Sequence, residues 1–144
     1  MLTSSPTPAT GKAPLQVTFD GSGSSDSGGG TLTSWSFDFG DGSTDSGTGS
    51  PPSTESHAYA AGTYTAELTV TDDQAVSDTA SIFVTANANV PPTAVLTSSP
   101  TPATGKAPLQ VTFNGSASSD SDGSIASWTL DFGDNTSNAS GSGV

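Results

Sequence analysis

The carboxylates and a single histidine are the side chains of this chain best suited to chemistry. Fourteen acids occur among 144 residues, and two pairs lie close in sequence, Asp38 with Asp41 and Asp72 with Asp73. Such a pair can act as general acid and base where an apolar cleft raises one pKa. Each pair here follows a short alternating run, in a turn without an aromatic cleft. The sequence has no G-x-S-x-G segment, which would supply a nucleophilic serine for His57 to activate. Cysteine and arginine are also absent. The sequence therefore predicts a protein that is not an enzyme.

Calcium binding is the second kind of chemistry that the acids suggest. Ca²⁺ takes hard oxygen ligands from loop carboxylates and backbone carbonyls. Asp120 and Asp122 share the segment Ser119–Gly123, and Asp26 stands at the matching place earlier in the chain. Neither segment has the full D-x-D-x-D-G spacing of an EF-hand loop. Asp26, Asp120 and Asp122 are the candidate calcium ligands, with solvated turn residues as the alternative, and no other cofactor is expected.

Charge narrows the range of partners. The formal net charge is -12, and the basic residues are Lys12 and Lys106. Nucleic-acid binding depends on basic groups that displace counterions from phosphates, and anionic membrane surfaces repel an acidic chain. No stretch approaches the about 18 apolar residues of a membrane-spanning helix. The sequence predicts neither nucleic-acid binding nor membrane insertion, and leaves extracellular proteins, polysaccharides and calcium as partners.

An internal repeat organises the chain. The segment LTSSPTPATGKAPLQVTF at Leu2–Phe19 recurs letter for letter 94 residues later at Leu96–Phe113. SWSFDFGDG from Ser34 returns 93 residues later as SWTLDFGDN from Ser127. This period is close to the about 100 residues of an immunoglobulin-like sandwich and too long for a solenoid repeat. We expect two domains, residues 1–87 and 88–144.

The second copy repeats only part of the first. Residues 88–144 hold no counterpart of the stretch from about Ser53 to Thr85. We therefore expect an excerpt of a longer array, with neighbouring repeats as partners and any signal peptide upstream. The second copy should be unstable alone, or pair its open strand edge with another chain. The apolar residues that lack an opposing layer are Leu109, Val111, Phe113, Trp128, Leu130 and Phe132.

Four runs in the first copy alternate apolar with polar side chains. A period of two is typical of half-buried antiparallel strands. Clusters of Gly, Ser and Asp at 20–30 and 40–50 separate the runs, and no segment of 12 residues holds a helical apolar period. The sequence predicts an all-β chain. The runs are Leu15–Phe19, Trp35–Phe39, Tyr64–Val70 and Ala80–Val84.

Several segments, in this order, resemble the PKD domain family. They are WSFDFGDGS at Trp35–Ser43, HAY at His57–Tyr59, GTY at Gly62–Tyr64, LTVTD at Leu68–Asp72 and PPTA at Pro91–Ala94. The resemblance implies an immunoglobulin-like β-sandwich, nearly complete in the first copy and partial in the second. It also implies an extracellular or cell-surface location, because the family occurs as tandem modules in surface-layer proteins, adhesins and secreted hydrolases.

The chain departs from the family pattern at two places. Phe37 and Leu130 stand where the family usually has tryptophan, and both keep an apolar side chain. Asn135 replaces the last glycine of DFGDG in the second copy, and asparagine tolerates a left-handed turn position. Neither change alters the expected fold.

We interpret the motif residues as structural. Phe39 would anchor the strand end in the core, Gly40 and Gly42 would allow positive φ, and Asp41 would accept backbone N–H groups. His57 and Tyr59 lead into a strand whose Tyr64 can bond back to the main chain, as in a tyrosine corner. The full set is Trp35, Phe37, Asp38, Phe39, Gly40, Asp41, Gly42, His57 and Tyr59, with Trp128, Asp131, Phe132, Gly133 and Asp134 in the second copy.

These observations favour a non-catalytic spacer or adhesion module of a larger secreted or cell-surface protein. The alternatives are a polysaccharide- or protein-binding accessory domain of a secreted hydrolase, and a calcium-regulated module. Sugar binding needs exposed planar aromatics, and the strand parity of Trp35 and Trp128 places both rings in the core. An exposed Trp35 or Trp128 would favour the accessory role.

Overall fold

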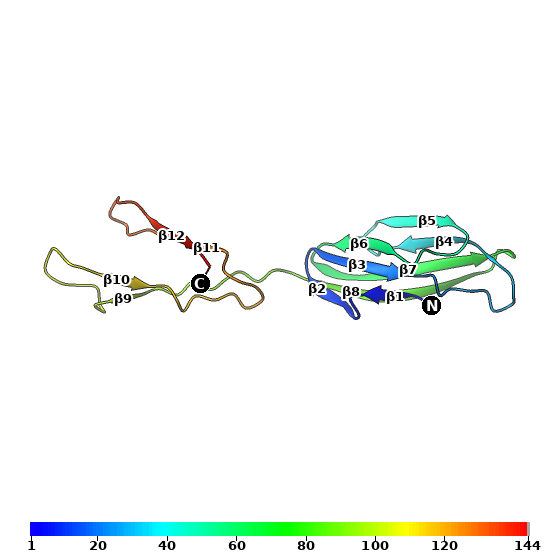
Figure 1. Ribbon diagram of the computed structural model, residues 1–144, viewed down its shortest axis with the longest axis horizontal. Coiled ribbons are helices and arrows are strands. Elements are labelled where there is room, and N and C mark those ends of the chain that lie inside the picture. The colour runs from blue at the N-terminus through cyan, green and yellow to red at the C-terminus, as the bar shows by residue number, and fades with distance from the viewer. Residues whose placement is uncertain (144) are drawn as a thin grey trace. The chain divides into compact units, whose positions relative to one another are not determined.

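Eight strands form in the first part of the chain, and four of them contain the alternating apolar runs. The computed structural model describes residues 1–143 and divides into two compact units, Met1–Ala88 and Asn89–Val144. The strands of the first unit are labelled in Figure 1. They are β1 (Thr3–Ser5), β2 (Ala9–Lys12), β3 (Leu15–Asp20), β4 (Leu32–Asp38), β5 (Thr44–Thr48), β6 (Glu55–Tyr59), β7 (Gly62–Asp72) and β8 (Ser77–Asn87).

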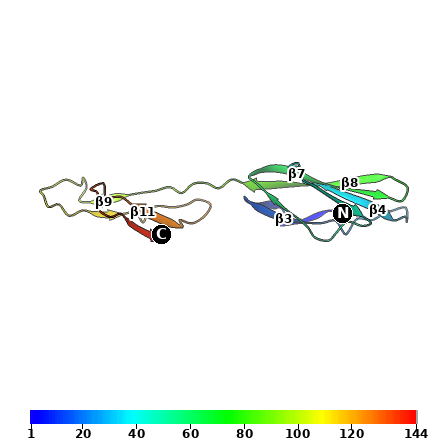
Figure 2. The same ribbon diagram turned by 90° about the horizontal axis from the view of Figure 1, so that it is seen from above.

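Two sheets face each other in this unit. One has the order β1-β3-β6 and the other the order β2-β8-β7-β4-β5. All neighbours are antiparallel except β2 and β8, which run parallel. Figure 2 shows β3 lying across from β7 and β8. The predicted all-β, immunoglobulin-like sandwich is confirmed, one nearly complete copy followed by a partial one.

The core lies between the two sheets and follows the two-residue period. Val17 and Phe19 of β3 face Phe37 of β4 and Leu68 of β7, and all four are almost fully buried. Phe19 and Phe37 rings lie 5.8 Å apart at their centroids. Burying a side chain of this size contributes about 1.5–3 kcal/mol. The core includes further buried residues, which are Ala9, Leu15, Phe39, Tyr59, Ala66, Val84 and Ala86.

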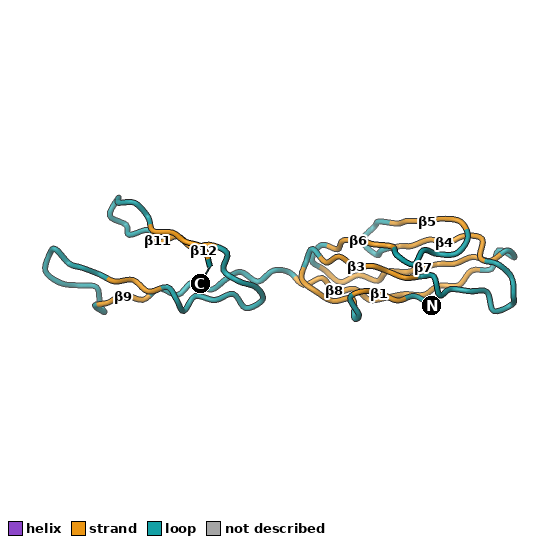
Figure 3. Tube along the Cα trace, viewed as in Figure 1, coloured by secondary structure: helices purple, strands orange, loops and turns teal. Residues whose placement is uncertain are grey.

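The second unit repeats two strand pairs of the first. β9 (Thr97–Ser99) pairs with β10 (Thr112–Asn114) as β1 does with the end of β3, and β11 (Ser127–Leu130) pairs with β12 (Ala139–Ser142) as β4 does with β5. Figure 3 colours these strands orange and the connecting loops teal. Among the described residues of the unit, no strand corresponds to β6, β7 or β8.

Aromatic burial in the second unit corrects one expectation. Strand parity places Trp128 in the core, but Trp128 is 42% exposed, and Phe113 and Phe132 beside it in the same unit are 38% and 42% exposed. The physical reason is the missing opposing layer. Phe83 on β8 is 78% exposed because it lies on the opposite parity to the buried Val84. Within residues 1–143, no helix is long and apolar enough to cross a bilayer.

Candidate functional site

The candidate site is the turn that follows β4. β4 ends at Asp38, whose Oδ1 accepts the Gly40 N–H at 2.8 Å, and Asp41 Oδ1 accepts the Ser43 N–H at 2.9 Å. Gly40 and Gly42 have φ of +80° and +94°. Glycine reaches these left-handed values without a steric penalty. Two carboxylates therefore close the turn by capping its backbone.

His57 of β6 joins this turn to the core. Its ring stacks on Phe39, with centroids 4.3 Å apart and planes within 8°, and its Nε2 lies 2.7 Å from Asp41 Oδ2. The side chain is only 19% exposed. The bond to His57, followed by the one from Ser43, lowers the pKa of Asp41 below its usual range. Asp41 is thus a charged acceptor held by two donors.

Tyr59 completes the cluster from the buried side. Its ring meets His57 edge-on at 4.8 Å, and its hydroxyl donates to the Phe39 carbonyl oxygen at 3.1 Å. Burial, and then the nearby Asp41 and Asp38, raise the pKa of Tyr59, so that the phenol remains a donor at physiological pH. The Tyr64 hydroxyl donates to the Ala60 carbonyl at 3.2 Å, which confirms the expected bond back to the main chain.

The second unit contains the same turn after β11, with equivalent hydrogen bonds. Gly133 N–H donates to Asp131 Oδ1 at 2.8 Å, and Thr136 N–H donates to Asp134 Oδ1 at 3.0 Å. The hydroxyl and N–H of Thr136 lower the pKa of Asp134. Asn135 has φ of +60°, which confirms that it takes the left-handed position of Gly42. Phe132, the counterpart of Phe39, packs against Phe113 at 5.9 Å.

The three candidate calcium ligands cap backbone N–H groups. Asp26 in the first unit accepts from Gly28 at 2.6 Å and Gly30 at 2.9 Å. In the second unit, Asp120 accepts from the Asp122 N–H at 3.1 Å, and Asp122 accepts from the Val90 N–H at 3.2 Å.

The structure brings one unexpected acid to Asp26. A Cβ built on Gly30 would meet carboxylate oxygens of both Asp26 and Asp73. Across residues 1–143, no group of three or more acidic or histidine side chains is placed to hold a metal ion. Calcium at Asp26, Asp120 and Asp122 stays a prediction.

Comparison with known protein families shows to which family the chain belongs. A family model of the PKD domain matches residues 4–86 and again residues 89–144. The chain belongs to the PKD domain family. A search of the curated proteins finds no significant match.

Solved structures also resemble this pair of PKD copies. The PKD1 domain of the Vibrio cholerae metalloprotease PrtV is 28% identical, with a TM-score of 0.46 over 60% of this chain and 93% of that one. A structure described for the promiscuous specificity of carbohydrate-binding modules from the β-sandwich superfamily is 26% identical, with a TM-score of 0.51. The match covers 69% of this chain and 46% of that one, so this chain spans about half its length. Fibronectin(III)-like modules of Clostridium thermocellum CbhA are 18% identical, with a TM-score of 0.43 over 61% of this chain and 98% of that one.

The two tryptophans have the same local setting but different burial. Trp35 lies against Gly47 and meets Phe37 edge-on at 5.9 Å, partly buried on the core of the first PKD copy. Trp128 lies against Gly141 in the same way, but its side chain reaches an open cleft. The two indoles therefore differ in exposure, with Trp128 42% exposed and Trp35 partly buried.

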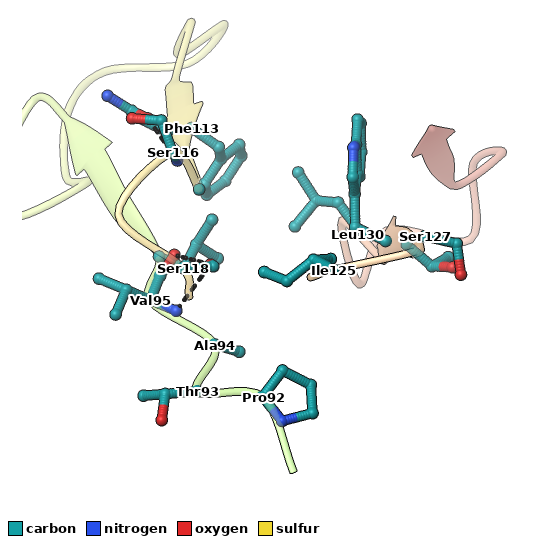
Figure 4. A pocket seen from close by; sticks show the side chains of 15 residues that line it. Pro92, Thr93, Ala94, Val95, Phe113, Ser116, Ser118, Ile125, Ser127 and Leu130 are labelled. Carbon is teal, nitrogen blue, oxygen red and sulfur yellow. Dashed lines mark hydrogen bonds between the residues drawn. The ribbon is translucent and has the colours of Figure 1, made fainter. Parts of the chain in front are cut away.

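That cleft, of about 650 Å³, lies within the second PKD copy. Figure 4 shows Val95 and Phe113 on one side and Ile125 and Leu130 on the other, with Phe113, Ile125 and Leu130 directed into the space between. The lining residues carry no charged side chain. The sequence did not predict this cleft as a site. The signal for it was the missing counterpart of Ser53–Thr85, because that stretch covers the same apolar positions in the first copy.

Asp41→Asn should make the stability of the first PKD copy less dependent on pH. We expect a loss of about 1 kcal/mol at neutral pH, because bonds to a charged acceptor contribute about 1.5–3 kcal/mol and partial exposure weakens them. The folded pKa of Asp41 is lowered, so its contribution is complete above the unfolded pKa and is lost as the pH falls through the folded pKa. Thermal melts between about pH 2.5 and 7 measure this. Asp78→Asn, at an exposed position, is the control, and a deficit of Asp41→Asn that stays constant over this range would contradict the prediction.

Proposed function

We propose that this chain is a non-catalytic spacer in a larger secreted or cell-surface protein. The observation that carries the proposal is that the candidate reactive side chains bind the protein's own backbone or pack on its core. Asp38 and Asp41 cap the turn, His57 stacks on Phe39, and the Tyr59 hydroxyl binds the main chain. Groups engaged in this way hold the fold together. The tandem match to the PKD family supports the extracellular setting.

A spacer must hold its neighbours at a defined separation. The first copy supplies a two-sheet sandwich, and the segment Asn89–Val95, with which the second unit begins, contains Pro91 and Pro92. Proline fixes φ near about −65°, and proline-containing linkers are stiffer than glycine-rich ones. The proposed mechanism is therefore steric, with folded copies joined by a linker of limited flexibility.

Replacing both prolines tests this role. Because the chain has no cysteine, dyes can be attached uniquely through Gln74→Cys and Ser121→Cys, both at exposed loop positions. We expect the Pro91→Gly/Pro92→Gly variant to give a broader distribution of single-molecule transfer efficiencies than the native linker, with unchanged melting of the first copy. The control Asn87→Gly/Ala88→Gly alters the chain just before the linker and should broaden the distribution less. Equal distributions for native and Gly-Gly linkers would contradict the spacer proposal.

An accessory role in polysaccharide binding is the second candidate. It is favoured by Trp128, which is 42% exposed beside the cleft, and by the likeness to a structure described for carbohydrate-binding modules. An exposed indole offers a flat face to a sugar ring. The test is retention of the chain on an insoluble polysaccharide. Retention that is lost in Trp128→Ala and kept in the control Phe83→Ala would support the accessory role in place of the spacer role.

A further inference from the structure

The second copy contains three Asn-x-Ser segments, and the first copy contains none. Such a triplet, with any residue except proline in the middle, is the acceptor pattern for N-linked glycosylation. Residues 1–86 hold no asparagine at all, so the pattern arises at positions where the two copies differ. The three segments are Asn114-Gly115-Ser116, Asn135-Thr136-Ser137 and Asn138-Ala139-Ser140.

Two of these asparagines lie in the turn between β11 and β12. Asn135 takes the left-handed position of Gly42. β12 pairs with β11 as β5 does with β4, which places Asn138 at the position of Thr44. All four residues are exposed. Because the turn of the first copy belongs to a sandwich with both its sheets, the exposure of this position does not depend on the strands that the second copy lacks.

Asn114 is a less favourable acceptor. Its Oδ1 accepts the Ser116 N–H at 2.9 Å, so the side chain closes a turn of its own. Asp20, at the equivalent position of the first copy, accepts the Ser22 N–H in the same way and is partly buried. A side chain at this position therefore shapes the end of the strand, and a complete sandwich leaves it less room than the turn after β11.

A second observation concerns the strand that follows Asn138. β5 is the last strand of the five-stranded sheet, and it carries Asp45. A charged side chain on an edge strand discourages pairing with another chain. In β12 the position of Asp45 is taken by Ala139, and none of the residues 139–142 is charged. A glycan is bulky and solubilising, and at Asn138 it would take over the protection that the charge gives in the first copy.

We propose that Asn138 carries an N-linked glycan. This inference rests on the proposed secreted or cell-surface location, because the sugar donor, an oligosaccharide linked to a polyprenyl phosphate or diphosphate, is used where chains cross a membrane. The Asn138 Nδ2 forms a bond to the anomeric carbon of the first sugar, and the bond from that carbon to the carrier phosphate breaks. The amide gives up one proton, and the carrier leaves with the electron pair of the broken bond.

Mass spectrometry of the protein recovered from outside the cells that produce it tests this proposal. Chymotrypsin cuts after Phe113 and Phe132, which separates Asn114 from the other two acceptors. We expect the peptide that begins at Gly133 to have the mass of an added oligosaccharide. Fragmentation of this peptide should place the sugar on Asn138.

Variants produced in the same cells show whether the acceptor pattern is responsible. Ser140→Ala destroys the pattern and keeps the asparagine, so the glycan should be lost. Ser140→Thr keeps the pattern and should keep the glycan. Ser142→Ala, at the next exposed position of β12, is the matched control and should also keep it.

The other outcomes separate this inference from the proposed function. An unmodified peptide in protein recovered from outside the cell would overturn the glycan and leave the spacer role standing. Protein found only inside the cell would overturn the proposed location, and this inference with it. A glycan on Asn114 or Asn135 in place of Asn138, or a glycan that persists in Ser140→Ala, would overturn Asn138 as the acceptor.

Discussion

Phe19→Ala should lower the free energy of unfolding of the first PKD copy by about 3–5 kcal/mol, the usual range for a buried phenylalanine. Phe113→Ala, at the equivalent position of the second copy, should cost its unit less than about 1.5 kcal/mol, because a side chain that is 38% exposed loses less on truncation. The two residues end the same eighteen-residue segment, so the sequence that precedes them cannot account for the difference. Only the opposing layer distinguishes them.

Hydrogen exchange measured separately at β3 and β10 would check this pair of substitutions. Protection at Leu15–Asp20 should fall sharply in Phe19→Ala, and the melting temperature of the first copy should drop by about 15 °C or more. Protection at Thr112–Asn114 should change little in Phe113→Ala. Equal losses of exchange protection in the two variants would mean that Phe113 is as enclosed as Phe19, which would contradict an open cleft in the second copy.

Gly40→Ala is the second substitution with a large expected effect. The residue has φ of +80°, and a Cβ there would collide with the backbone of Thr65 on the neighbouring strand β7. A left-handed conformation costs a residue with a side chain about 1–2 kcal/mol, and forcing packed backbone apart adds about 1–3 kcal/mol. We expect the first copy to lose about 3 kcal/mol in chemical denaturation.

Gly42→Ala is the matched control two residues away. Its φ of +94° is similarly left-handed, but a Cβ there meets nothing within 4 Å. Only the conformational strain remains, so the loss should be about 1 kcal/mol. If both variants lost the same amount, close approach of the turn to β7 would play no part in stability, and strain alone would explain both glycines.

The elements of the fold could be predicted from the sequence because side-chain parity carries the information locally. Leu15, Val17 and Phe19 alternate with polar residues and lie buried on one side of β3, as expected. The order of motifs then indicated a sandwich of the PKD type, since Trp35–Ser43, His57–Tyr59 and Gly62–Tyr64 follow each other in the order that the family shows.

Contacts between distant loops could not be predicted in the same way. Asp73 adjoins Asp72 in sequence, and the sequence suggested that pair, yet the fold brings the Asp73 carboxylate to Asp26 at Gly30. The stacking of His57 on Phe39 likewise depends on β6 and the end of β4 meeting across the two sheets. Strand parity predicts which face of a sheet a residue occupies, but not which residue of the other sheet it contacts. The functional roles assigned to Asp26 and His57 remain predictions.

The parallel pairing of β2 with β8 has a consequence for a module under tension. Ala9–Lys12 run beside Val84–Asn87 in the same direction, although one strand lies near the start of the domain and the other ends it. A pull on the two ends draws these neighbours in opposite directions along their length. Their hydrogen bonds then resist together in shear rather than opening one by one like a zipper. The first PKD copy thus contains one strand pair, β2 with β8, whose hydrogen bonds resist stretching in shear.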